Sequence, residues 1–129
     1  MRVWYKGKNY EGEQGSGCWP VCQEAGALCW DTVLPIPKTT ISAPVWGELT
    51  IMTNAHKPPA SLSATFFDAD TQKIIKQRTL LPKTEALLPL EVPAGNYIIS
   101  VFGGWDEGDV SYAFKVNAFY LAGNLACDE

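Results

Sequence analysis

SLSATFF, residues 61–67, is the stretch that decides the fold. Its leucine, alanine and first phenylalanine alternate with serine and threonine, which is the period of two expected for a strand with one buried face. Turn residues follow at 68–71, and an apolar-rich segment resumes at 74–81. We therefore predict an antiparallel hairpin here.

The same alternation continues on both sides of this hairpin. Short strands are predicted at residues 39–42, 45–53 and 86–92, separated by proline-rich or polar breaks. Residues 97–102 are apolar at nearly every position except Ser100, which predicts a central strand covered on both faces.

The last predicted strand is residues 110–119, and we expect it to close the sheet. Its two faces separate cleanly by residue type. We expect Tyr112, Phe114, Val116 and Ala118 to point inward and Ser111, Lys115 and Asn117 to point outward.

About seven to nine short strands, with proline and glycine between them and no convincing helix, predict an all-β fold. We expect an antiparallel β-sandwich, immunoglobulin-like or jelly-roll-like, with an open barrel as the alternative. The 129 residues suit a single domain. Residues 1–34 would form a hairpin and a disulfide knot, residues 38–120 the sandwich body, and residues 121–129 a tail.

The N-terminal segment begins with a predicted hairpin, in which Val3 to Tyr5 lead into a turn at Gly7 and Lys8. A knot of three cysteines and two tryptophans follows at residues 15–31. Pro35 and Pro37 then exclude central sheet pairing and mark a crossing segment.

The four cysteines allow three disulfide pairings, and spacing alone does not choose among them. We favour Cys18–Cys29, because each is followed by tryptophan and a compact loop separates them. Cys22–Cys127 would then fasten the C-terminal tail to the knot. A four-thiolate zinc site is the alternative, although only part of the spacing resembles one. The C-x-x-C spacing of a redox dithiol is absent.

Composition and charge narrow the functional classes. A hydrophobic content of 47% excludes a disordered chain, and no apolar run is long enough to span a bilayer. A net charge of −4 with dispersed basic residues argues against a nucleic-acid partner. Lys76 and Arg78 are expected on a solvated face. Bridged cysteines predict an extracellular, periplasmic or cell-surface protein, with an export signal or anchor outside this sequence.

Two motifs together resemble those of a known group. Residues 15–19 read GSGCW and residues 29–31 read CWD, after the YKGK hairpin. The second motif begins with PAGNY at 93–97 and continues through Trp105 to GDVSYAFKV at 108–116. The pair is similar to uncharacterised exported β-sandwich domains of bacteria and covers the chain from about Tyr5 to Phe119. The resemblance implies an exported or lipid-anchored sandwich and brings no catalytic residues with it.

Acidic loops are the candidate sites. Trp105 lies at a loop apex beside Asp106, Glu107 and Asp109, and we take these four as candidate binding residues. Calcium prefers carboxylate oxygens from such loops, so Asp106 and Asp109 are candidate ligands. A second acidic loop adds a further pair of candidates, Asp68 and Asp70. Aspartate is equally common at turns, where it accepts hydrogen bonds from its own backbone.

Catalysis is not expected. His56 is the only histidine, it lies in a proline-rich turn, and no G-x-S-x-G motif accompanies it. We therefore expect a non-catalytic binding or adhesion-type module without a cofactor, recognising a protein or cell-surface component. The alternatives are a calcium- or carbohydrate-binding accessory domain, the latter using exposed tryptophans such as Trp105, or a self-associating subunit of an extracellular assembly that pairs through edge strands.

Overall fold

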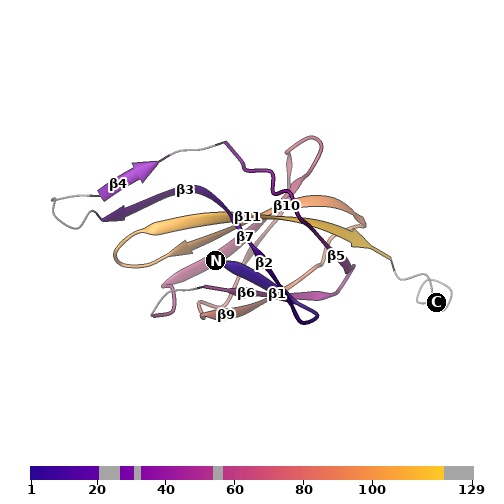
Figure 1. Cartoon of the computed structure of the whole chain (residues 1–129), viewed down its shortest axis with the longest axis horizontal. Helices are drawn as coiled ribbons and strands as arrows, with labels where there is room; N and C mark the ends of the chain where they lie inside the picture. The colour runs from indigo at the N-terminus through magenta and orange to yellow at the C-terminus, as the bar shows by residue number, and fades with distance from the viewer. Residues whose placement is uncertain (21–26, 31–32, 54–56, 121–129) are drawn as a thin grey trace.

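The computed structural model describes residues 1–20, 27–30, 33–53 and 57–120. The described residues form eleven strands in two sheets packed face to face, so the predicted all-β sandwich is confirmed (Figure 1). The strands are β1 (Arg2–Tyr5), β2 (Lys8–Glu11), β3 (Glu13–Pro20), β4 (Ala27–Trp30), β5 (Thr40–Pro44), β6 (Glu48–Met52), β7 (Ser61–Asp68), β8 (Ile74–Thr79), β9 (Glu85–Pro89), β10 (Gly95–Gly104) and β11 (Asp109–Phe119). Within these residues no helix could cross a membrane.

The smaller sheet, sheet A, has the strand order β2-β1-β6-β9. The larger, sheet B, has the order β4-β3-β11-β10-β7-β8, and β5 also pairs with β11. The longest ladder joins β10 to β11, from Gly95 opposite Ala118 to Gly104 opposite Asp109. Strand β11 is therefore an interior strand of sheet B, whereas the sequence predicted that it would close the sheet.

Chain connectivity distinguishes between the two predicted sandwich types. From β6 onward the chain visits sheet A, then sheet B twice, then sheet A, then sheet B twice. Strands β7, β10 and β11 become neighbours in one sheet while β6 pairs with β9 in the other. This Greek-key order is that of an immunoglobulin-like sandwich.

The core lies between the sheets and follows the predicted alternation. Leu49 and Ile51 of β6 are fully buried, as are Leu62, Ala64 and Phe66 of β7. Of the inward side chains predicted for β11, three are buried and Tyr112 packs against the core from its rim.

Tyr97 anchors the start of β10. Its ring meets Phe66 edge to face, with centroids 6.1 Å apart, and its hydroxyl donates to the carbonyl oxygen of Pro93 at 2.5 Å. A tyrosine at this corner, bonded to backbone a few residues upstream, is a feature of immunoglobulin-like sandwiches. It fixes the path by which the chain enters the sheet.

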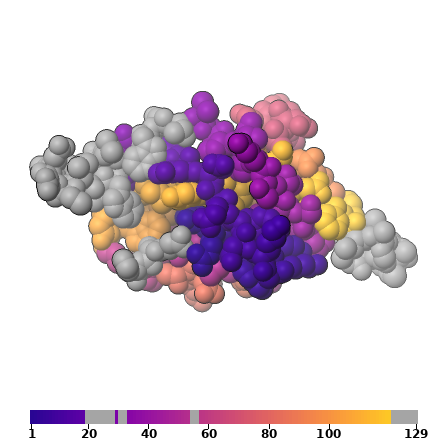
Figure 2. Space-filling view, viewed as in Figure 1, coloured from indigo at the N-terminus to yellow at the C-terminus, as the bar shows by residue number. Residues whose placement is uncertain are grey.

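The N-terminal segment belongs to both sheets. Strand β1 pairs with β6, and Val3 is fully buried in the core. The predicted first hairpin is present, although its two-residue turn is Lys6–Gly7, one position earlier than expected. Both turn residues have positive φ, as a type I′ turn requires, and glycine adopts that conformation without strain. Figure 2 shows this hairpin in indigo near the centre of one face.

Strand β5 corrects the prediction of a purely antiparallel domain, because it runs parallel to β11. Strand β3 is antiparallel to β11, and β4 is antiparallel to β3, so β4 already runs in the direction of β11. Residues 33–39 carry no strand and include the two predicted crossing prolines. They lead into β5 without reversing the chain, which places it beside the half of β11 that β3 leaves uncovered.

Strand β10 corrects a second prediction, that both of its faces are covered. Its inward residues and Ile98 are buried. On the outward face, however, Ser100 is only half-buried and Phe102 is 40% exposed. The apolar run therefore reflects a fully buried inner face and an outer face that opens to solvent toward the end of the strand.

The positions of Lys76 and Arg78 contradict a third prediction, that both side chains lie on a solvated face. The register places them opposite Phe66 and Ala64, on the inward side of edge strand β8 rather than on a solvated face. Both reach Glu91, which follows β9: Arg78 Nη1 donates to its carboxylate, and Lys76 Nζ donates to its carbonyl oxygen at 3.1 Å. The pairing ties the two sheets together, and inward charges are a known defence of edge strands against aggregation.

The Cys18–Cys29 disulfide, which the sequence analysis favoured, is present and joins β3 to β4. The predicted partners Cys22 and Cys127, the histidine His56 and the tail at residues 121–129 lie outside the described residues.

Replacing Tyr97 by phenylalanine should lower the free energy of unfolding by about 1 kcal/mol, because it removes a partly buried hydrogen bond while keeping the ring. Burial raises the pKa of the Tyr97 hydroxyl. As the pH rises, the unfolded state therefore ionises first, at the ordinary tyrosine pKa near 10. The free energy of unfolding falls above that pH, because ionisation then stabilises the unfolded state. The variant should lose less stability than the wild type between pH 9 and pH 11. Urea unfolding measures both effects, with exposed Tyr120→Phe as the control.

Candidate functional site

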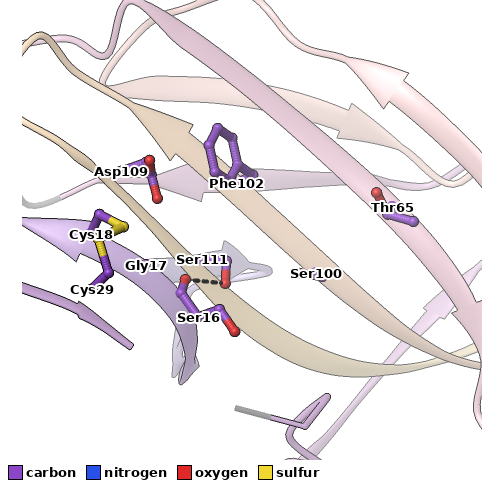
Figure 3. Close-up of a pocket in the computed structure, with 9 residues that line it drawn as sticks. All are labelled: Ser16, Gly17, Cys18, Cys29, Thr65, Ser100, Phe102, Asp109 and Ser111. Carbon is purple, nitrogen blue, oxygen red and sulfur yellow. Dashed lines mark hydrogen bonds between the residues drawn. A yellow bond between two sulfur atoms is a disulfide. The ribbon is translucent and has the colours of Figure 1, made fainter. Parts of the chain in front are cut away.

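The outward face of sheet B carries a cleft of about 500 Å³. Alternation along the strands puts polar side chains there while their apolar neighbours fill the core. The nine residues that line it come from five strands, β3, β4, β7, β10 and β11 (Figure 3). They are Ser16, Gly17, Cys18, Cys29, Thr65, Ser100, Phe102, Asp109 and Ser111.

Strand register explains why these residues meet. Ser100 of β10 lies between Thr65 of β7 and Ala113 of β11. Phe102, two residues further along β10, lies opposite Ser111. Side chains two residues apart point to the same face, so a line of hydroxyl groups and one aromatic ring crosses the middle of sheet B.

A β-bulge shapes the side of the cleft at β3. The register between β3 and β11 shifts between Val110 and Tyr112, leaving Gly15 and Ser16 opposite Ser111. The Ser111 hydroxyl donates to the backbone oxygen of Ser16 at 2.8 Å, the dashed contact in Figure 3. Bulges bend a strand and re-aim its side chains, and here the bend is fixed by a hydrogen bond from within the cleft.

The disulfide forms one end of the cleft. Cys18 pairs in register with Asp109, and Figure 3 shows the Asp109 carboxylate beside the Cys18–Cys29 bridge. Among the described strands, β4 pairs only with β3. The disulfide therefore reinforces the single set of backbone hydrogen bonds that holds β4 to the sheet. The disulfide therefore holds the outermost strand of sheet B in place next to the acid.

Phe102 supplies the cleft's aromatic surface. Its ring projects from β10 in Figure 3 toward the space above Asp109 and Ser111. A phenylalanine that is 40% exposed on the outer face of a central strand gains little from burial in the folded chain. A ligand could use that apolar area.

A second, smaller hollow of about 210 Å³ continues across the same face. It is lined by Ser63, Thr65, Gln77, Arg78 and Thr79, and it shares Thr65 with the cleft. Together the two hollows cross β3, β11, β10, β7 and β8. At the usual strand spacing, that path is about 19 Å long.

Charge is sparse inside the cleft. Among its nine described residues, Asp109 is the one ionisable group that is not a disulfide cysteine, and none is basic. Serine and threonine hydroxyls both donate and accept hydrogen bonds, whereas the aspartate carboxylate only accepts. The cleft is thus suited to a neutral partner that offers many hydroxyl or amide groups.

The structure separates the four candidate residues of the last loop. Asp109 lines the cleft, but Trp105 packs against Gly103, where an added Cβ would lie 2.9 Å from the indole ring, a distance only glycine permits. The indole nitrogen of Trp105 donates to the carbonyl oxygen of Lys57 at 3.0 Å. Trp105 is half-buried, whereas the sequence predicted an exposed tryptophan at this position.

Glu107 makes a salt bridge with Lys57, with Nζ and Oε2 2.7 Å apart. The hydrogen bond from Lys57 lowers the pKa of the Glu107 carboxyl and raises the pKa of the Lys57 ammonium. Because both side chains are exposed, this pair adds little stability. It joins the last loop to the segment before β7. Asp106 is exposed and does not line the cleft.

Asp68 and Asp70 occupy a turn. The Asp68 carboxylate accepts hydrogen bonds from the backbone N–H groups of Thr71 and Asp70, each at 2.9 Å. These bonds lower the pKa of Asp68. Within residues 1–20, 27–30, 33–53 and 57–120, no three histidine, cysteine or acidic side chains gather as a metal site would need. The turn-capping interpretation of this loop accounts for the geometry that is present.

Two exposed tryptophans of the described residues, Trp4 and Trp46, lie instead on and beside sheet A. Trp4 of β1 and Leu87 of β9 flank Thr50 in one row across its outer face, and they are 44% and 58% exposed. Trp46, before β6, is 69% exposed and has a φ of 71°. A left-handed backbone is unfavourable for such a bulky residue.

Six cleft residues were not predicted from the sequence: Ser16, Gly17, Thr65, Ser100, Phe102 and Ser111. One signal was available, because Ser100 interrupts an otherwise apolar run. The others look like ordinary outward positions, and only strand register brings them together.

Removing the disulfide by Cys18→Ala together with Cys29→Ala should lower the free energy of unfolding by about 2–3 kcal/mol, since it frees a short loop in the unfolded chain. Urea unfolding measures the change. A reductant should destabilise the wild type more than the double variant. Equal stability of the two proteins under oxidising conditions would contradict this role.

A scan against protein-family models, a search of curated proteins and a search of solved structures each found no match for this chain.

Proposed function

We propose that this protein is a non-catalytic, exported binding module that attaches to a component of cell surfaces. The outward face of sheet B is its binding surface, with the cleft beside the disulfide as its centre. The observation that carries the proposal is the convergence there of outward hydroxyl groups, one acid and one exposed phenylalanine. Concave surfaces with a few convergent polar groups are the usual form of binding sites.

Two further features support this function. The Cys18–Cys29 disulfide favours an oxidising compartment outside the cytoplasm, where surface components are met. The cleft also lies on paired strands rather than on loops, and hydrogen-bonded ladders hold its side chains on both sides of β10. A rigid surface loses little conformational entropy when it binds.

A second candidate function, self-association into an assembly, is favoured by sheet A. Trp4 and Leu87 leave an apolar row exposed on its outer face, on the opposite side of the sandwich from the cleft. Tryptophan is enriched at the centres of protein interfaces, and identical patches can pair about a two-fold axis. The partner we assign to this row is a second copy of the chain.

Cell binding tests the first function. Fluorescently labelled protein should bind fixed bacterial cells in flow cytometry, and Ser100→Arg should reduce binding at least tenfold by filling the cleft. Thr65→Arg, on the neighbouring strand, should act in the same way. Thermal unfolding checks that each variant is folded.

Ser42→Arg is the matched control. Ser42 is exposed on β5 and pairs with Asn117, about 20 Å along β11 from Ser111. The substitution is the same and the sheet is the same, but the position is outside the cleft. Equal binding by Ser100→Arg and Ser42→Arg, or no binding of the wild type to these cells, would contradict the proposed function.

Sedimentation velocity tests the second candidate. The wild type should sediment faster as its concentration rises, and Leu87→Lys should keep it monomeric by placing a charge in the apolar row. Ser100→Arg should leave sedimentation unchanged. A wild type that is monomeric at all concentrations would exclude self-association through this row.

A further inference from the structure

We propose that the cleft binds a neutral, polyhydroxylated chain: an oligosaccharide lying across the strands of sheet B, with one sugar ring stacked on Phe102. This inference rests on the proposed function and specifies its ligand. It follows from the cleft's charge, its hydrogen-bonding groups, its aromatic ring and its length.

Charge selects against anionic ligands. Asp109 is negative and none of the nine described lining residues is basic. Phosphate, sulfate and nucleic-acid backbones depend on lysine or arginine for affinity, so they would meet repulsion here without compensation. A neutral ligand avoids that cost.

Hydrogen bonding selects for hydroxyl groups. Thr65, Ser100 and Ser111 offer groups that donate and accept, and Asp109 accepts strongly. Vicinal hydroxyl groups of a sugar can bond to a carboxylate and a hydroxyl side by side. The Ser111 hydroxyl already donates to Ser16, which leaves its oxygen able to accept from a ligand.

The apolar contribution comes from one ring. The C–H groups on one side of a sugar carry a slight positive charge and pack against the negative face of an aromatic ring. Phe102 offers such a ring amid hydroxyl groups. A protein partner would be expected to need a wider apolar centre, of the kind that Trp4 and Leu87 provide on sheet A.

Length selects a chain over a single sugar. The cleft and the second hollow share Thr65 and follow one path toward β8, about 19 Å from β3. Beyond Thr65 the lining continues as Ser63, Gln77 and Thr79, which supply neutral donors and acceptors, and as Arg78. The Arg78 guanidinium is already paired with the Glu91 carboxylate, which offsets its charge.

Titration with defined oligosaccharides tests the proposal. The probes are cellohexaose, maltohexaose and xylohexaose, whose rings carry vicinal diols, with hexagalacturonate as the anionic comparison. Amide resonances in ¹H–¹⁵N spectra should shift at Thr65, Ser100, Phe102 and Ser111 on addition of at least one neutral chain. Hexagalacturonate should bind at least tenfold more weakly than that chain. No shift with any neutral probe, or tighter binding of hexagalacturonate, overturns the proposal.

Variants test the stacking. Phe102→Ala should weaken binding about tenfold and Phe102→Trp should restore it, because the ring supplies the contact. Trp46→Ala is the matched control, since Trp46 is 69% exposed beside the other sheet, and it should bind as the wild type does. Unchanged affinity in Phe102→Ala overturns the stacking and with it the proposal.

Periodate separates this inference from the proposed function. Periodate cleaves vicinal diols, so pretreating the fixed cells should abolish their binding of the wild type. If binding survives periodate but is lost after proteinase K and in Ser100→Arg, the module function stands and the oligosaccharide inference fails. If Ser100→Arg binds cells as well as the wild type, the proposed function itself is wrong, whatever the effect of periodate.

Discussion

The ladder between β10 and β11 is the interaction on which the rest of the structure depends. It joins residues 95–104 to residues 109–118 without a register shift, and each strand then serves as the template for one half of sheet B. On one side, β10 pairs with β7, which pairs with β8. On the other side, β3 pairs with the first half of β11 and β5 pairs with its second half. Because the ladder fixes which side chains face inward, it also fixes the opposite face. Burying Ile99 and Val101 necessarily turns Ser100 and Phe102 toward the cleft.

This coupling explains how a surface site can be built without a loop. The cleft residues on β7, β10 and β11 are held by strands whose other face is packed in the core, so their hydroxyl groups keep fixed spacings set by strand geometry. Two devices then make the flat sheet concave: the bulge opposite Ser111, and the disulfide that keeps β4 alongside β3. Both act at the end of β11 where Asp109 lies, and the cleft lies at that end of the sheet.

The sequence was sufficient for the fold wherever one residue type decides one face. Alternation in residues 61–67 and 110–119 correctly predicted the inward side chains, and the tryptophan-flanked pair Cys18–Cys29 correctly predicted the disulfide. It was insufficient wherever distant strands must be aligned. The parallel pairing of β5 depends on the direction in which β4 leaves the knot, and the inward direction of Lys76 and Arg78 depends on a bulge near Phe67. The cleft has the same origin, because Thr65, Ser100 and Ser111 are unremarkable until register places them in one line.

The candidate loops led to the opposite error. Their acidic and aromatic residues suggested a binding site, but these residues serve contacts within the fold. Asp68 caps its own turn, Glu107 pairs with Lys57, and Trp105 covers Gly103. Each group is already occupied by the fold, and a group that is satisfied internally has less to offer a ligand. Phe102 and Trp4 differ in this respect, because the fold leaves a large part of each ring exposed. They lie on opposite sheets with the core between them, and the polar surroundings of one contrast with the apolar row around the other. A sandwich built this way can bind through one face and associate through the other, because substitutions on either outer face leave the inner alternation intact.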